Sequence, residues 1–276
     1  MKLWANGLGG TTGDSLATTK PLYTSGDVWF VDSTIGVDGA SPAGKDRQKP
    51  LATLAQAQTN GADGDIVVLL SSHTETFTVG LSLTKSLIIV GEGSSGGVPT
   101  AQFKINAANQ SVFVLNAAAI QLRNIKFPAS VQSNSGAGGG VGKVAIGATG
   151  NSTLIRGCYI EQSGLDQLPG LSIASGVARI RIENTTIIST ATAVATRPTY
   201  GIWHIGTVTD LDVNGLVLSD GTVGFSGASW DGTTGATTRL RAENVSLLLG
   251  ADAKHHASTT GQLIPSTATS GGAVSW

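Results

Sequence analysis

The stretch IRIENTTI, at residues 180–187, decides the fold. Apolar and polar side chains alternate in its first four residues, which is typical of a β-strand with one buried face. Asn184 then breaks the alternation, and asparagine is one of the few residues that tolerate a left-handed backbone. A second short apolar run follows, so the stretch predicts two short strands joined by a tight corner.

The same unit recurs along the chain. It reads IQLRNIKF at 120–127, LDVNGLVL at 211–218 and LRAENVSL at 240–247, and looser copies surround Gly91 and Gly157. The corner positions are 91, 124, 157, 184, 215 and 244, at spacings of 33, 33, 27, 31 and 29 residues. A period near 30 residues with two or three strands per unit is typical of stacked rungs in a parallel β-helix.

Stacking the units in register predicts two columns on the outer face. The first column holds Arg181, Asp212 and Arg241. The second column holds Glu183, Asn214 and Glu243. Opposite charges meet in the first column, and we interpret both columns as a solvated polar face that helps to fix the register.

The segments around the repeats differ from them. Residues 1–27 and 251–276 are rich in Gly, Ser and Thr and lack periodicity, so we predict extended arms around a β-helix domain at 28–250. Residues 50–59 have apolar side chains at helical spacing and good helix formers. They predict one short helix that caps the open first rung.

Composition excludes several classes of protein. The chain has 17 basic and 18 acidic residues and a net charge of -1, which argues against a basic nucleic-acid binder. The single cysteine, Cys158, excludes an intramolecular disulfide framework. No apolar stretch is long enough to span a membrane, and the first residues show no signal peptide, so we expect synthesis in a cytoplasm.

The stretch from 29 to 93 resembles the opening of the pectate-lyase-like, right-handed parallel β-helix family. The resemblance rests on VD at 31–32, GVDG at 36–39, KPLATL at 49–54, GDIVVL at 64–69, TET at 74–76 and LIIVGEG at 87–93. It implies a strand, a capping helix and then the first rungs of an all-β, right-handed parallel β-helix. It says little about function, because this fold hosts lyases, hydrolases and non-catalytic virion proteins.

Within that superfamily the chain looks most like bacteriophage virion proteins. The likeness lies in the glycine-rich arm, the compact β-helix, the low charge and the abundance of Ser, Thr, Ala and Gly. It implies a head decoration protein, a tail fibre or a receptor-binding tailspike, commonly a homotrimer. The chain is short and shows no attachment domain or coiled coil, which favours decoration of the head.

The sequence supports an enzymatic function less well than a structural one. The acids of the rungs are dispersed, at Glu161, Asp166, Glu183, Asp210, Asp212, Asp220, Asp231 and Glu243. A calcium site needs six to eight oxygen ligands, so we predict no metal site and no cofactor. Glu183 and Glu243 would stand about 9.6 Å apart, a permissive distance for glycoside hydrolysis, but both lie beside arginines.

The remaining reactive side chains are better explained structurally. We interpret His73 and His204 as structural, and Cys158 as a small core residue. Adjacent His255 and His256 point to opposite faces of an extended chain, which disfavours a zinc site. The glycine-rich run at 136–142 lacks the Gly-Lys-Ser/Thr ending of a phosphate loop and indicates an insertion between rungs at 129–143.

The expected function is therefore structural: a capsid decoration protein on the head surface of a virion, with the major capsid protein as partner. The contacts expected for the arms are Met1, Lys2, Leu3, Trp4 and Trp276, because large aromatics on small-residue arms make good anchors. A trimer is expected, with no nucleic acid and no membrane. The first alternative is a tail-fibre or tailspike module that binds host saccharide, and the second is a polysaccharide lyase or hydrolase.

Overall fold

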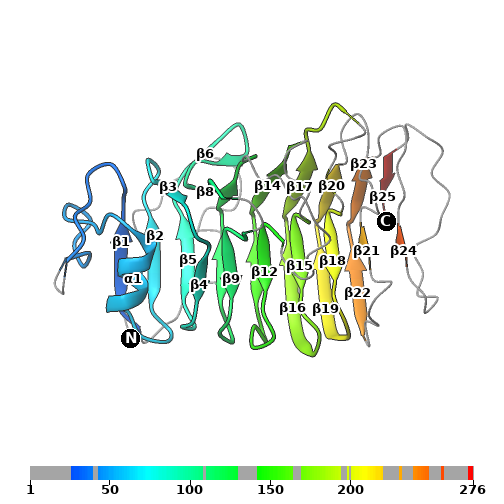
Figure 1. Ribbon diagram of the computed structural model, residues 1–276, viewed down its shortest axis with the longest axis horizontal. Helices are drawn as coiled ribbons and strands as arrows, with labels where there is room; N and C mark the ends of the chain where they lie inside the picture. Colours follow the sequence, from blue (N-terminus) through cyan, green and yellow to red (C-terminus); the bar gives the residue numbers. More distant parts are fainter. Residues whose placement is uncertain are drawn as a thin grey trace.

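The protein is a parallel β-solenoid, seen here in a computed structural model (Figure 1). The structure describes residues 26–39, 43–107, 110–129, 142–163, 169–193, 198, 200–219, 230–231, 239–248, 256–257 and 273–275. Three sheets run along the solenoid, and each rung after the first strand of the chain contributes one strand to each sheet. The prediction of an all-β parallel β-helix with one short helix is confirmed.

Sheet 1 contains the alternating strand of each repeat. In spatial order it consists of β1 (Val28–Val31), β2 (Ile66–Leu69), β5 (Ile88–Gly91), β10 (Gln121–Arg123), β13 (Leu154–Arg156), β16 (Val177–Glu183), β19 (Val208–Asn214) and β22 (Leu240–Glu243). All neighbouring pairs in it are parallel.

Sheet 2 contains the strands that follow the corner. They are β3 (Thr74–Phe77), β8 (Gln102–Ile105), β11 (Lys126–Phe127), β14 (Tyr159–Gln162), β17 (Thr186–Ser189), β20 (Val217–Ser219), β23 (Ser246–Leu248) and β25 (Ala273–Ser275). The last of these, β25, pairs antiparallel with β23, whereas the other pairs are parallel.

Sheet 3 completes each rung. It consists of β4 (Leu81–Leu83), β9 (Phe113–Leu115), β12 (Val144–Ile146), β15 (Leu171–Ile173), β18 (Ile202–His204), β21 (Trp230–Asp231) and β24 (His256–Ala257). A separate antiparallel hairpin joins β6 (Ser94–Ser95) to β7 (Val98–Pro99). The range 251–276, assigned above to an arm, thus contributes one strand to sheet 3 and one to sheet 2.

The corner after sheet 1 has the predicted backbone. Asn124, Gly157, Asn184, Gly215 and Asn244 have φ values of 52°, 60°, 46°, 70° and 52°, and the strands before them pair in register. Asparagine and glycine therefore alternate along this column, which we call the corner column. Gly91 differs, because it ends β5 without a positive φ and lies against the backbone carbonyl of Asn124.

A second left-handed column precedes sheet 1, and the sequence analysis missed it. Ala119, Ser152, Arg179 and Asp210 have φ values of 57°, 61°, 59° and 58°. They occupy equivalent positions, because each lies two residues before a member of one paired set. That set is Gln121, Leu154, Arg181 and Asp212, in β10, β13, β16 and β19. Only Asp210 is of a type that tolerates this backbone well, so residue type gave little signal of a left-handed turn.

The core runs continuously through the solenoid. Inward residues of sheet 1, such as Ile89, Leu122, Ile155 and Ile182, are fully buried. Aromatic rings pack together in one part of the core, where Phe103 lies 4.8 Å from Phe113 and Phe113 lies 5.5 Å from Phe127, measured between ring centroids. Each such apolar side chain contributes about 1.5–3 kcal/mol by leaving water.

The short helix closes the N-terminal end of this core. It is α1 (Leu54–Asn60), with Thr53 as its N-cap, and Leu54 and Ala57 are buried against the first rung. It begins later than the predicted residue 50, because Leu51 forms a parallel bridge with Val31 and so stays extended. No helix in the described part of the chain is long and apolar enough to cross a membrane.

The corner column yields the first prediction. Gly215→Ala should lower the free energy of unfolding by about 2 kcal/mol, because alanine at a left-handed φ costs about 1–2 kcal/mol and its Cβ would meet the side chain of Asn184. Gly157→Ala is the matched control. It has a similar φ, but the nearest atom to its Cβ would lie 3.8 Å away, so it should cost about 1 kcal/mol. Urea unfolding followed by circular dichroism measures both, and equal losses would show that only the backbone conformation matters.

Candidate functional site

The outer face of sheet 1 carries an ordered set of charged side chains. Its later rungs place Arg181, Asp212 and Arg241 in one column, as predicted. The neighbouring column runs Arg123, Arg156, Glu183, Asn214 and Glu243. The predicted register of these columns is therefore confirmed.

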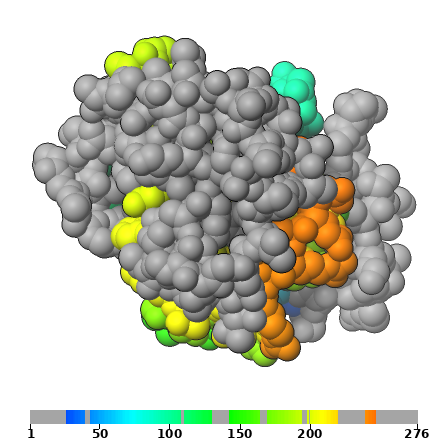
Figure 2. All heavy atoms as spheres, turned by 90° about the vertical axis from the view of Figure 1, so that its right-hand side faces the viewer, coloured from blue at the N-terminus to red at the C-terminus, as the bar shows by residue number. Residues whose placement is uncertain are grey.

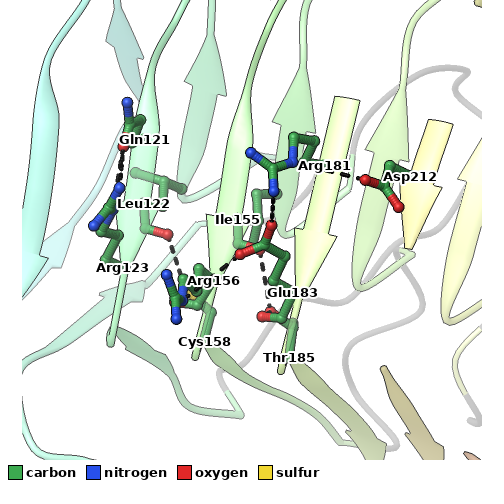
Figure 3. A network of polar contacts seen from close by, with 10 residues as sticks. All are labelled: Gln121, Leu122, Arg123, Ile155, Arg156, Cys158, Arg181, Glu183, Thr185 and Asp212. Atoms are coloured by element: carbon green, nitrogen blue, oxygen red, sulfur yellow. Dashed lines mark hydrogen bonds and ion pairs between the residues drawn. The ribbon is translucent and has the colours of Figure 1, made fainter. Parts of the chain in front are cut away.

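These side chains pair with one another (Figure 3). Arg181 forms an ion pair with Glu183 on its own strand and reaches Asp212 on the next, with 3.8 Å between Nε and Oδ2. Arg156 lies 3.7 Å from the same Glu183 carboxylate, and Glu183 is itself only 18% exposed. We call Arg156, Arg181, Glu183, Asp212, Arg241 and Glu243 the charge ladder.

The last rung repeats the arrangement. Arg241 Nη2 lies 2.9 Å from Glu243 Oε1, and this hydrogen bond is the main cause that raises the pKa of the Arg241 guanidinium. Figure 2 looks onto this end of the solenoid and shows part of the last rung, in orange, at the surface. Beside the ladder, Arg239 bridges to Asp210 with 2.6 Å between Nη2 and Oδ2.

The two carboxylates considered for hydrolysis are both engaged. Asn214 separates Glu183 from Glu243 in the register, and each carboxylate accepts from an arginine of its own strand. A carboxylate that acts as a general acid or a nucleophile must reach its substrate, and here an arginine occupies part of each carboxylate. Within the described ranges, no three His, Cys, Asp or Glu side chains gather where they could hold a metal ion.

A second polar feature lies where sheet 2 turns toward sheet 3. The connection from β11 to β12 is the predicted insertion at 129–143, of which residues 130–141 lie outside the described part. Lys143 at its end is 1% exposed, and its Nζ donates to the carbonyls of Pro128, at 2.9 Å, and Glu161. The ammonium group therefore ties both ends of the insertion to the next rung.

The Glu161 carboxylate completes this contact. It accepts from the backbone N–H of Ala129 at 3.3 Å and pairs with Lys126 Nζ at 3.1 Å. Sequence analysis did not single out Lys143 or Lys126. A lysine at the end of a glycine-rich loop gives no sign of burial, because lysine is usually exposed.

The predicted structural histidines are buried. His73 is fully buried, accepts a hydrogen bond from the Ser33 backbone N–H at Nδ1, and packs edge-on against Phe103 at 5.0 Å. Its Nε2 lies 3.5 Å from Glu75, whose carboxylate accepts from the first helical N–H, that of Leu54. His73 thus links β1, β3 and α1. His204 is 2% exposed.

Cys158 and Trp203 lie in different surroundings. Cys158 is buried in the core as predicted, and burial raises the pKa of its thiol to about 12. Trp203 stacks on Tyr200 with 5.8 Å between ring centroids and 21° between ring planes. Both aromatic side chains are half-buried.

The predicted partner contacts Met1, Lys2, Leu3, Trp4 and Trp276 lie outside the described residues, as do Asp166, Asp220 and His255. No protein-family model, curated protein or solved structure matches this chain.

The charge ladder yields a salt-dependent prediction. Glu183→Gln should lower the free energy of unfolding by about 0.5–1 kcal/mol, because two arginines lose their shared carboxylate at a partly exposed site. The loss should shrink in high salt, where exposed charges are screened. Glu243→Gln, in the same column but 47% exposed and with one arginine, is the control and should cost about half as much or less. A loss at Glu183 that does not change with salt would contradict an electrostatic role.

The buried lysine yields a larger effect. Lys143→Met should cost about 1–3 kcal/mol, because the carbonyls of Pro128 and Glu161 lose a buried donor. Lys126→Met removes a lysine from the same Glu161 but at a site that is 25% exposed, so it should cost less than about 1 kcal/mol. Thermal unfolding compares the two variants. Equal losses would show that burial of Lys143 is not what matters.

Proposed function

We propose that this protein is a structural virion protein of the capsid-decoration type, which binds a head lattice and stabilises it. One observation carries the proposal: each carboxylate of the charge ladder forms an ion pair with an arginine of its own strand or of a neighbouring strand. Such a ladder helps to fix the register of the rungs, and among the described residues of this face it leaves no pair of carboxylates without an arginine partner. In this proposal the protein acts by binding a partner through its surface, and it does not catalyse a reaction.

The architecture supports a load-carrying role. Every rung pairs with its neighbours along three sheets, and a single core runs from α1 through the stacked rungs. A solenoid of this kind is stabilised by nearest-neighbour contacts between rungs, and it offers a partner an extended surface. The resemblance to bacteriophage β-helix proteins supports the assignment to a virion.

Attachment is assigned to the two ends of the chain. Met1, Lys2, Leu3, Trp4 and Trp276 are the proposed contacts with the major capsid protein, and a homotrimer is the proposed assembly. Apolar arm surface buried across capsomer boundaries contributes about 25 cal/mol per Å² before the costs of association. Two aromatic anchors per chain, repeated three times, would multiply that contribution through avidity.

The test is a mixing experiment with purified full-length protein and undecorated capsids. We expect saturable co-sedimentation and a raised melting temperature of the capsid, and we expect Trp4→Ala with Trp276→Ala to weaken binding by at least about tenfold. Tyr159→Ala, on the outer side of sheet 2, is the control and should bind normally. Failure of the wild-type protein to co-sediment with any capsid would overturn the proposal.

One observation favours the tail-module alternative. The stacked pair of Tyr200 and Trp203 on sheet 3 offers an aromatic surface on which the apolar face of a sugar ring could stack. The same protein should therefore be tested for pull-down of host surface polysaccharide. Retention that Trp203→Ala abolishes, together with no capsid binding, would move the protein to the tail.

A further inference from the structure

The outer face of sheet 1 changes character along the solenoid. In the first three strands, outward positions are apolar, whereas from β10 onward they are mostly polar or charged. We call the apolar part the apolar strip. It consists of Val28, Phe30, Ile66, Val68, Leu70, Ile88 and Val90, which form a cluster separate from the core.

The apolar strip is buried although it lies on the outside. Phe30, Ile66, Val68, Leu70 and Val90 are between 2% and 7% exposed. In the same column of the charge-ladder rungs, Glu183 is 18% exposed and Asn214 is classed as exposed. The outward face of a solenoid is buried to this degree only when a segment of chain lies on it.

The described chain marks two borders of the strip. Beyond the carboxyl end of β5, Arg47 pairs with Glu92, with 2.6 Å between Nη2 and Oε2. At the opposite border the chain enters β1, where the Asp27 backbone N–H donates to Asp65 Oδ1 at 2.6 Å. Gly26 lies so close to the carbonyl of Gly64 that a Cβ could not be accommodated. The described chain therefore begins beside the strip, next to Val28 and Ile66.

The arm has the composition to cover this strip. Residues 1–25 contain Leu3, Trp4, Leu8, Leu16, Leu22 and Tyr23, and only three charged residues. In an extended chain Leu16 and Leu22 project to the same side, because side chains alternate. Two leucines on one side of a segment with few charges match an apolar surface three strands wide.

We propose that the segment at 16–23 of the same chain packs on the apolar strip and is the reason for its burial. Crossing from β1 to β5 takes about 10 Å, since strands lie about 4.8 Å apart. Four extended residues span about 13 Å, so Leu22 reaches the strip from Gly26. Residues 1 to about 10 remain beyond the strip, so the inference holds whether or not the arm tip binds a capsid.

A single engineered thiol tests this in the full-length protein. Val68→Cys places a thiol in the strip, and the native Cys158 gives little background because its thiol is buried and its pKa is raised to about 12. We expect N-ethylmaleimide to modify this thiol slowly near neutral pH. Adding Leu16→Ser and Leu22→Ser should speed the modification at least about tenfold by releasing the cover.

Matched controls make each outcome decisive. Asn214→Cys occupies the same column five strands later and is exposed, so it should react fast with or without the arm substitutions. If Val68→Cys reacts as fast as Asn214→Cys while the arm is intact, the proposal is overturned. It is also overturned if modification stays slow after both leucines are replaced and after residues 1–25 are deleted. Protection that disappears on dilution would assign the cover to a second copy of the chain instead.

Discussion

The left-handed corner after sheet 1 is the constraint on which the rest of the structure depends. At the corners that follow β10, β13, β16, β19 and β22, one residue adopts a positive φ, and glycine and asparagine are the residues that do so at low cost there. Once these residues stack, every strand before and after them is fixed in register. A slip by one residue would put arginines in the core and isoleucines in water, so register and burial enforce each other.

Because register is fixed, side chains of one kind collect into columns. The charge ladder is one result, since carboxylates and guanidinium groups from adjacent rungs meet at strand spacing. The apolar strip is the other, built from the same outward positions in earlier rungs. A single sheet face is thus divided into a part that water can solvate and a part that needs cover. The two parts differ in the residue types at their outward positions, and both are built from parallel strands in register.

The features that sequence reasoning predicted are those with a period. Alternation within 180–183 and the recurring Asn or Gly gave the strands, the corner and the outward columns. The second left-handed column was not predicted, because Ala119, Ser152 and Arg179 are not of types that indicate a positive φ. Burial of Lys143 and stacking of Trp203 on Tyr200 depend on neighbours distant in sequence, which a single chain read linearly does not reveal.

The two ends of the solenoid are chemically different, and this restricts how copies can assemble. At the N-terminal end α1 covers the core, and Leu51 pairs with Val31 along the outer edge of β1. At the other end, β22 is the last strand of sheet 1 in the part of the chain that the structure describes, and its Ala242, at an inward position opposite Val213, is exposed. Because Gly44 and Leu51 already bond to the outer edge of β1, that edge is not available to pair with a strand of a second copy. Under the proposed function, contacts with other molecules would then involve the lateral faces and the arms, and the division of sheet 1 places its apolar part beside the start of the described chain.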